Sequence, residues 1–414
     1  MDNYDVVIVG GGMVGLSLAA ALAPSGMRIA VLDTQVAGAP DANKPQSRVS
    51  AISHLSENLF RRLGVWDAIA EHAAPYQHMS VWEQDSFANI DFSADSVHQT
   101  HLGHIIENAA IRYPLWQRCE QAGARLIAPV KITNLHHGEQ QSVISLDNGQ
   151  LLACRLVVGA DGVHSQVRQQ GALPMTFWDY EHTAIVANVR TQQPHNDTAR
   201  QVFTPDGPLA FLPMQDPHLC SIVWSVNTDK AEALMALDDE AFCQALASTF
   251  DLRLGLCSLD TPRSGFPLTM RFVRQWAAER LVLVGDAAHS IHPLAGQGVN
   301  LGLQDVAVLA QSLTDTYQAG KDIGRLRYLR PYERQRKTAA VEMIAAMEGF
   351  KQLFGTALAP LKLLRGLGLS AVNRLPGVKS ALIKQAMGMG AEVPDLTRPH
   401  FTPNGPQSHT REHG

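Results

Sequence analysis

The chain lacks the cysteine pattern of a disulfide-stapled or zinc-ribbon protein. Among its 414 residues there are only five cysteines, an odd number, and none stands in a C-x-x-C pair. Disulfide frameworks and zinc knuckles use closely spaced, paired cysteines. We therefore expect isolated thiols, which are typical of a protein in the reducing cytoplasm.

Long apolar runs are also missing. No stretch of about 18 uncharged apolar residues occurs, the length that a membrane-spanning helix needs. The N-terminus carries no cationic leader, and its apolar run Val6–Val9 has only the length of a strand before glycines follow. These absences predict a cytoplasmic protein that does not cross a membrane.

A charge excess of either sign is absent as well. The formal net charge of -5 gives no sign of the basic surface that nucleic-acid binding requires, so no nucleic-acid partner is expected. A hydrophobic content of 45% is that of an ordinary globular protein. The length suits two or three domains with a large core.

What the chain does contain is a glycine-rich motif near its start. Gly10-x-Gly12-x-x-Gly15 follows a predicted strand, Asp5–Val9, and opens a predicted helix. In such a motif one glycine makes the tight turn, one lets the backbone approach a pyrophosphate, and one lets helix pack on strand. The helix N-terminus offers free N–H groups to the phosphates. The motif favours a dinucleotide site without deciding between FAD and NAD.

Asp33 supports the same interpretation. It ends a second predicted strand, Arg28–Leu32, at about the 20-residue distance from the glycines that dinucleotide sites use. A carboxylate there can accept hydrogen bonds from a ribose.

Two further predicted strands end in glycine and aspartate. Gly159-Ala160-Asp161-Gly162 follows the apolar run Leu156–Gly159, and on its own an ordinary Asp-Gly turn explains it equally well. Leu281–Val284 runs into Gly285-Asp286, after which a glycine-rich loop leads into a helix ending near Leu313. The second case places a carboxylate beside a strand end and another helix N-terminus beside it.

The three elements in this order resemble the glutathione-reductase-type flavoprotein monooxygenases of the p-hydroxybenzoate hydroxylase class. The run His292–Gly302 resembles the signature of the ubiquinone-biosynthesis hydroxylases. The stretches His101–Ile111 and Phe177–Val189 are most similar to their 2-polyprenylphenol hydroxylase (VisC-type) branch. The resemblance covers nearly the whole chain up to about residue 390.

The resemblance and the order of strands and helices imply an α/β fold. We expect a glutathione-reductase-type, Rossmann-like FAD-binding domain with an inserted sheet-rich substrate domain and a helical C-terminal region. The expected boundaries are 1–75, 101–175 and 262–345 for the discontinuous FAD-binding domain, 76–100 and 176–261 for the substrate domain, 346–390 for the helical region, and 391–414 for a disordered tail.

The resemblance also assigns FAD as cofactor and gives matching residues their roles. Arg48 corresponds to an arginine near the FAD, although as a residue it could equally be a surface arginine. The implied cofactor-binding residues are Gly10, Gly12, Gly15 and Asp33 on the ADP part, Asp161 near FAD and the nicotinamide path, Gly285 and Asp286 at the ribityl chain, and Gly298, Val299 and Asn300. The implied catalytic loop beside the isoalloxazine ring contains Pro293, Gly296 and Gln297, with no side-chain base assigned.

The family's reaction is the hydroxylation of an aromatic ring. NAD(P)H or a partner electron donor reduces the flavin, and one atom of molecular oxygen is transferred to an electron-rich ring. The expected substrate is a polyprenylphenol of ubiquinone biosynthesis, hydroxylated at the C5-type position. The alternatives are another ring position, a NAD-dependent dehydrogenase that uses only the first motif, and a non-catalytic FAD-fold protein that binds prenyl lipids or acts as a scaffold.

Partners beyond the substrate follow from charge. From Gly349 to Gly390 there are six basic residues and no acidic one, which favours contact with an anionic membrane surface or with other ubiquinone-biosynthesis proteins, although a solvated helical face explains it equally well. A location at the inner membrane surface would suit a prenylated substrate. Homo-oligomerisation stays open.

Two pairs of histidines stand three residues apart, His101 with His104 and His289 with His292. That spacing alone would allow a shared metal ion. Neither pair has a carboxylate and cysteine set nearby in the sequence, and the second lies inside the glycine-rich motif. No metal site is therefore predicted.

Four aromatic residues of the sheet-rich segments are candidates for the substrate cleft. An ordinary place in the hydrophobic core is the favoured interpretation of each. They are Trp82, Phe203, Phe211 and Trp224.

Overall fold

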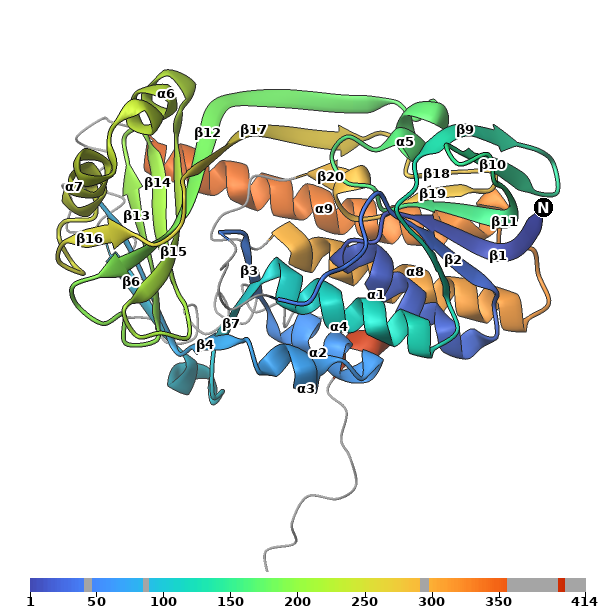
Figure 1. Ribbon diagram of the computed structural model, residues 1–414, viewed down its shortest axis with the longest axis horizontal. Helices are drawn as coiled ribbons and strands as arrows, with labels where there is room; N and C mark the ends of the chain where they lie inside the picture. Colours follow the sequence, from blue (N-terminus) through green and yellow to red (C-terminus); the bar gives the residue numbers. More distant parts are fainter. Residues whose placement is uncertain (41–46, 85–88, 291–297, 356–393, 399–414) are drawn as a thin grey trace, which may run out of the picture.

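The computed structural model describes residues 1–40, 47–84, 89–290, 298–355 and 394–398, with only the backbone described for 179–180 and 346–355. These residues form two large sheets and a small one (Figure 1). All five cysteines are free thiols and four are buried, which confirms that they form no disulfides.

The first sheet is mostly parallel and contains the predicted strand–helix–strand unit. Its order is β18-β19-β11-β1-β2-β8, with β10 and β9 added beside β11. Its strands are β1 (Asp2–Val9), β2 (Ile29–Leu32), β8 (Arg125–Ile127), β9 (Ile132–His137), β10 (Ser142–Leu146), β11 (Leu151–Gly159), β18 (Ala277–Ala278) and β19 (Leu281–Leu283). Val6, Val7 and Ile8 are fully buried, as expected for a strand covered on both faces.

Three helices lie side by side against one face of this sheet (Figure 1). They are α1 (Met13–Leu22), α4 (Asn108–Gln121) and α8 (Gly298–Gln318). Gly302 allows α8 to pack closely, because a Cβ there would lie 2.9 Å from Val14 Cγ2 and 3.1 Å from Gly285 Cα. The close approach brings the start of α8 to the strand ends of the sheet.

The second sheet is mainly antiparallel and has nine strands in the order β20-β17-β12-β15-β14-β13-β5-β6, with β16 beside β12. Its strands are β5 (His78–Glu83), β6 (Asn89–Ser93), β12 (Met175–Thr191), β13 (Thr198–Thr204), β14 (Gly207–Pro213), β15 (Leu219–Asn227), β16 (Cys257–Leu259), β17 (Ser264–Val273) and β20 (His289–Ser290). The long pair β12 and β17 runs from this sheet back to the first (Figure 1). Sheet pairing therefore extends past the expected boundary at residue 262, and the domain division stays a proposal.

Two helices, α6 (Thr228–Ala236) and α7 (Asp239–Thr249), cover the outer face of the second sheet. Trp82, Phe211 and Trp224 are at most 3% exposed and pack there with Phe242 and Phe250. Three of the four candidate cleft aromatics thus belong to the hydrophobic core under α6 and α7, which confirms the favoured interpretation of them as core residues. Phe203 alternates with the core residue Val202 along β13, so it lies on the inner face.

A small third sheet lies beside the first. It has the order β3-β7-β4 and consists of β3 (Val49–Ile52), β4 (Ala74–Tyr76) and β7 (Gly103–Glu107). Helix α2 (His54–Leu63) follows β3 directly and α3 (Trp66–Ala70) follows α2. Ser53 caps α2, since its hydroxyl accepts a hydrogen bond from Ser56 N, and Gly64 ends it at φ +72°.

The C-terminal region differs in part from its prediction. Helix α9 (Leu326–Gly355) includes 346–355, and 356–390 lie outside the described residues. The expectation of disorder is wrong for 394–398, where η5 (Asp395–Thr397) packs on α2 and α8. Thr397 is 1% exposed and its carbonyl accepts from Asn58 Nδ2 at 3.1 Å. The stability of this short element comes from its packing on α2 and α8, and the polar composition of the tail gives no sign of that packing.

In the part of the chain that the structure describes, no helix is long and apolar enough to cross a membrane.

Candidate active site

Four of the predicted segments meet at one edge of the first sheet. Because β2, β1, β11 and β19 are parallel and in register, their carboxyl ends align: Val9 pairs with Leu32 and Gly159, and Gly159 pairs with Leu283. Hydrogen bonds continue past the strands, from Gly10 N to Leu32 O at 2.8 Å and from Val284 N to Gly159 O at 3.0 Å. The crevice beyond such an edge is where open α/β sheets bind their ligands.

The first glycines have three different surroundings. Gly10 has φ +111°, and a Cβ on it would lie 2.2 Å from Ala160 O, so the first loop is pressed against the second. A Cβ on Gly15 would lie 1.9 Å from Gly10 O, which keeps α1 tight against the strand end. At Gly12 nothing lies within 4 Å, so this edge of the loop is open. Tight turn, close packing and open approach are the three roles a pyrophosphate loop requires.

The N-terminus of α1 is free to bind an anion. Its N-cap residue is Gly12, so no N-cap side chain accepts a hydrogen bond from the first N–H groups, and the first turn contains no acidic residue. The first N–H groups of a helix have no partner within the helix and carry partial positive charge.

Asp33 lies beside the glycine loop and braces it. Its Oδ2 accepts from Gly11 N at 2.6 Å and its Oδ1 from Gln35 N at 2.7 Å. Arg112 of α4 joins the group, donating from Nε to Gly11 O at 2.7 Å and lying 3.4 Å from Asp33 Oδ1. Sequence reasoning missed Arg112 because no local pattern marks it. The carboxylate is held in place and keeps lone pairs for a ribose.

Asp161 caps the short helix that follows it. Its Oδ2 accepts from Gln166 N at 2.7 Å and Val167 N at 3.2 Å, at the start of α5 (Gln166–Gln170). Its Oδ1 is buried and has no hydrogen-bond partner among the described residues. Burial raises the pKa of this carboxyl above its ordinary value. The buried oxygen can accept a hydrogen bond from a bound group.

Arg168 connects the second loop to the third. It is 5% exposed and donates to Ala287 O at 3.0 Å and to Val163 O at 2.8 Å. The Asp161 and Asp286 loops therefore hold each other in position.

Asp286 lies in the short 3-10 turn Gly285–Ala287 that follows β19. Its side chain is open to solvent although protein surrounds it closely, and this burial raises its pKa above the ordinary value. The charges of His289 and then of Arg48 act in the opposite direction on this pKa. The Arg48 guanidinium lies 4.5 Å from the centre of the Phe266 ring on β17. Arg48 is thus exposed, as a surface arginine would be, and its guanidinium lies over the ring of Phe266.

A buried charge network lies behind Gly285. Asp305 of α8 is fully buried, and its Oδ2 accepts from Gly285 N at 3.0 Å and from His289 Nε2 at 2.6 Å. Its Oδ1 accepts from Arg336 Nε at 2.7 Å. Burial would raise the pKa of Asp305, but His289 and Arg336 outweigh it and the pKa is lowered. Sequence reasoning missed this network, although Asp305 is the sole acidic residue from Gly298 to Leu313.

The first turns of α8 lie in the same region, since a Cβ at Gly302 would come within 3.1 Å of Gly285 Cα. Gly298 is exposed, and a Cβ there would meet nothing within 4 Å. Val299 is partly buried against the core of the first sheet. Asn300 holds the helix to its neighbours: its Oδ1 accepts from Ser53 N at 3.0 Å and Ser56 Oγ at 2.7 Å, and its Nδ2 donates to Ala51 O at 2.7 Å. Pro293, Gly296 and Gln297 lie outside the described residues.

The donor set fits FAD. Two helix N-termini and an open glycine edge suit a pyrophosphate, and three carboxylates at strand ends suit ribose and ribityl hydroxyls. The open edge at Gly12, together with the buried Asp161 oxygen that has no partner among the described residues, favours a bound group over a plain turn.

Comparison with known proteins supports this fit. The family model for the FAD binding domain matches residues 3–346. The 3-demethoxyubiquinol 3-hydroxylase of Escherichia coli is 36% identical over 388 residues, which cover 93% of this chain and 98% of that protein. The ubiquinone hydroxylase UbiL of Rhodospirillum rubrum is 36% identical over 398 residues, covering 95% and 92%.

Solved structures show the same fold at lower identity. The p-nitrophenol 4-monooxygenase PnpA of Pseudomonas putida superimposes with a TM-score of 0.78 at 18% identity, covering 95% of this chain and 100% of that one. PqsL of Pseudomonas aeruginosa, in complex with 2-aminobenzoylacetate, gives a TM-score of 0.73 at 20% identity, covering 89% and 100%.

Proposed function

The chain belongs to the FAD binding domain family, among the flavoprotein monooxygenases of the ubiquinone-hydroxylase type, and from this premise we propose that it hydroxylates the ring of a polyprenylated phenol in ubiquinone biosynthesis. It is an FAD-dependent monooxygenase. The family assignment leaves no support for a NAD-dependent dehydrogenase or for a non-catalytic scaffold.

One observation carries the proposal. Relatives named as ubiquinone or demethoxyubiquinol hydroxylases align over more than nine-tenths of this chain, a span long enough to include its strand-end loops. A prenylated phenol is the substrate class that fits these names.

We assign the residues as follows. Gly10, Gly12 and the start of α1 receive the pyrophosphate, Asp33 the ribose, and Asp286 the ribityl chain. When bound, FAD supplies the redox chemistry that splits molecular oxygen. The start of α8 at Gly298 contributes partial positive charge, which stabilises negative charge on a group held there. Reducing equivalents come from NAD(P)H or a partner electron donor.

The ring position is the finer part of the proposal. The 2-polyprenylphenol-like stretches His101–Ile111 and Phe177–Val189 favour a C5-type hydroxylation. The relative named as a 3-hydroxylase of demethoxyubiquinol favours a later ring position instead. Both place the same chemistry in one pathway.

Lipid mass spectrometry of the source strain without this gene, grown with oxygen, separates the two. Accumulation of a polyprenylphenol without an added ring oxygen supports the C5-type step. Accumulation of a more oxidised intermediate moves the enzyme to a later position. A normal quinone profile in a strain without a second hydroxylase gene would contradict the proposal.

We also propose, from charge alone, that the acid-free segment 349–390 brings the protein to an anionic membrane surface or to other enzymes of the pathway. Most of this segment lies outside the described residues. In liposome flotation the full-length protein should bind, and truncation at Gly349 should remove this binding. Equal flotation of the full-length and truncated proteins would contradict the proposal.

A further inference from the structure

A cluster of buried histidines around one glutamate lies outside the flavin residues. Its members are His54 and Glu57 of α2, His101 just before β7, and His104 within β7. Their side chains are nearly covered, with 7% of Glu57, 14% of His101 and 10% of His104 exposed. No residue assigned to FAD belongs to this cluster.

The carboxylate of Glu57 is only half satisfied. Its Oε1 accepts from Arg61 Nη2 at 2.7 Å and Nε at 3.0 Å. Its Oε2 is buried and has no hydrogen-bond partner within the described part of the chain. A buried carboxylate oxygen without a donor costs free energy of about 1–3 kcal/mol or more. Something other than the described hydrogen bonds must compensate it.

Two imidazole nitrogens face this oxygen at an unusual distance. His101 Nε2 lies 3.4 Å and His104 Nδ1 lies 3.5 Å from Glu57 Oε2. Hydrogen bonds from nitrogen to oxygen are shorter, about 2.7–3.2 Å. Ligand atoms at the corners of a tetrahedral zinc site, with bonds of about 2.0–2.1 Å, are about 3.3 Å apart. The observed spacing is that of ligands around an ion.

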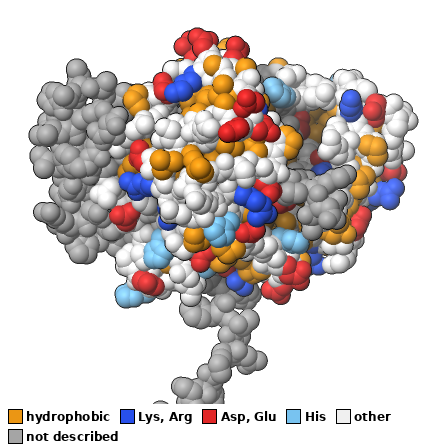
Figure 2. All heavy atoms as spheres, turned by 60° about the vertical axis from the view of Figure 1, so that its left-hand side comes forward, with side chains coloured by type: hydrophobic (Ala, Val, Ile, Leu, Met, Phe, Trp, Pro, Cys, Tyr) orange, Lys and Arg blue, Asp and Glu red, His pale blue; other side chains and the backbone are white. Residues whose placement is uncertain are grey.

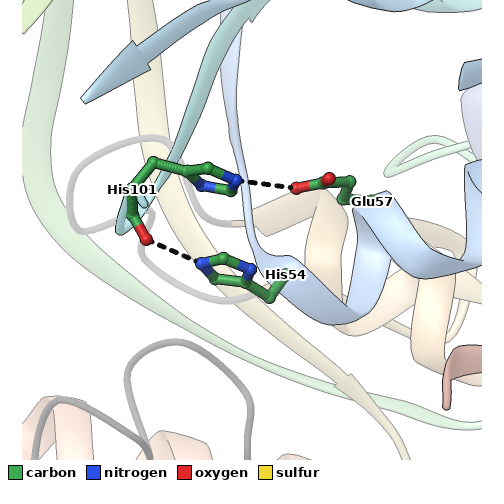
Figure 3. A group of neighbouring side chains, drawn as sticks. All are labelled: His54, Glu57 and His101. Carbon is green, nitrogen blue, oxygen red and sulfur yellow. Dashed lines mark hydrogen bonds and ion pairs between the residues drawn. The ribbon is translucent and has the colours of Figure 1, made fainter. Parts of the chain in front are cut away.

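His54 supplies a further nitrogen. Its ring stacks on His101 with centroids 4.3 Å apart and planes at 5°. Its Nε2 donates to His101 O at 2.8 Å, which fixes the tautomer and leaves the Nδ1 lone pair free. The two stacked rings each present a nitrogen on the side of Glu57 (Figure 3), and ligand atoms of His54, Glu57 and His101 lie within 4.8 Å of one another.

We propose that His54, Glu57 and His101 form a binding site for one divalent transition-metal ion of the zinc class, with His104 beside them facing the same Glu57 oxygen. Imidazole and carboxylate donors suit zinc, whereas a hard cation such as Mg²⁺ would require more oxygen. The site is structural: it ties the start of α2 to the segment entering β7, next to the Ser53 and Ser56 contacts of Asn300. It does not depend on the proposed substrate.

The surroundings leave ring nitrogens unpaired. The His101 and His104 side chains are largely buried, and the Nδ1 atom of each has no hydrogen-bond partner within the described residues. Arg61 is the opposing group, because its charge repels a cation. Its side chain is 50% exposed, so it can turn into solvent when the ion binds.

The no-metal expectation from the sequence rested on the absence of a neighbouring carboxylate. The fold supplies one from α2, far away in the chain, together with a third histidine. Only the tertiary structure brings His54 and Glu57 to the His101 and His104 pair.

Zinc content and affinity test the proposal on the flavin-loaded protein. After chelator treatment and titration with zinc against a competing chelator, the wild type should bind one ion per chain. Glu57→Gln and His101→Ala should each weaken binding by more than about ten-fold, the loss that even a supporting partner causes at metal sites. His72→Ala, at an exposed histidine, is the matched control and should bind as the wild type does.

A charge variant separates a metal site from a purely structural cluster. Arg61→Gln removes the cation that repels the ion, so it should tighten zinc binding. This variant keeps the proposal testable if Glu57→Gln misfolds and loses its flavin. X-ray absorption at the zinc edge should show nitrogen and oxygen neighbours near about 2.0–2.1 Å and no sulfur. Absence of zinc binding in the wild type, unchanged affinity in Glu57→Gln, or a sulfur neighbour would each overturn the proposal.

Discussion

The two large sheets use their residues in opposite ways. The first places glycines and carboxylates just after the ends of parallel strands, where Gly10, Asp33, Asp161 and Asp286 follow one edge of the sheet. The second packs large aromatics such as Phe211 and Trp224 in the core that α6 and α7 cover (Figure 1). Changes in the first should alter cofactor binding and those in the second stability.

The surface drawn in Figure 2 does not separate one kind of side chain from another. Hydrophobic, basic and acidic side chains are interspersed over the face drawn in Figure 2, without one dominant charged area. This mixture agrees with the small net charge of -5.

The largest expected effect is on the second sheet's core. Phe211→Ala removes a ring that is 2% exposed and stacks 3.9 Å from Phe250. Loss of such a buried ring costs about 3–5 kcal/mol. Chemical denaturation should show this fall, while titration of the folded apoprotein with FAD gives an unchanged affinity. If FAD affinity fell along with stability, the two sheets would not have these separate roles.

An intermediate effect is expected at the glycine loop. Gly15→Ala places a Cβ 1.9 Å from Gly10 O, so the backbone must shift. Such overpacking costs about 1–3 kcal/mol of free energy. FAD affinity should fall by about ten- to 100-fold, measured by fluorescence titration. Gly38→Ala, where a Cβ meets nothing, should bind FAD normally. Wild-type affinity in Gly15→Ala would contradict the assigned loop.

The smallest effect concerns charge at the start of α8. Gly298→Asp fits without a clash but adds a negative charge at the helix end that we propose to act on the flavin. An interaction of about 1–2 kcal/mol with a helix end corresponds to a fall in turnover of about ten-fold. Gly298→Asn, equal in shape and neutral, should stay close to the wild type. If both variants turn over alike, the placement of this helix end is wrong.

The sequence predicted what is local. Gly10, Gly12 and Gly15 lie in one turn, and Asp33 follows at a fixed distance, so spacing alone revealed them. The Arg112 brace, the Asp305–Arg336 pair and the Glu57–histidine cluster join residues far apart in the chain, and no spacing encodes them.

Two further elements show the same limit. The short turn η5 docks on α2 and α8 because Thr397 finds a buried place there, which composition could not reveal. The aromatics Trp82, Phe211 and Trp224 alternate toward the outer face, and the side of a strand that faces a cleft is decided only when the sheet is assembled.

The most direct test of the account uses labelled oxygen. Purified, FAD-loaded protein is given a 2-polyprenylphenol, a reductant and ¹⁸O₂, and the product is weighed by mass spectrometry. The account predicts a ring-hydroxylated product that carries one ¹⁸O atom from the gas and none from water. A product labelled only from water, or consumption of oxygen and reductant with no ring-hydroxylated product from any phenol of the pathway, would contradict it.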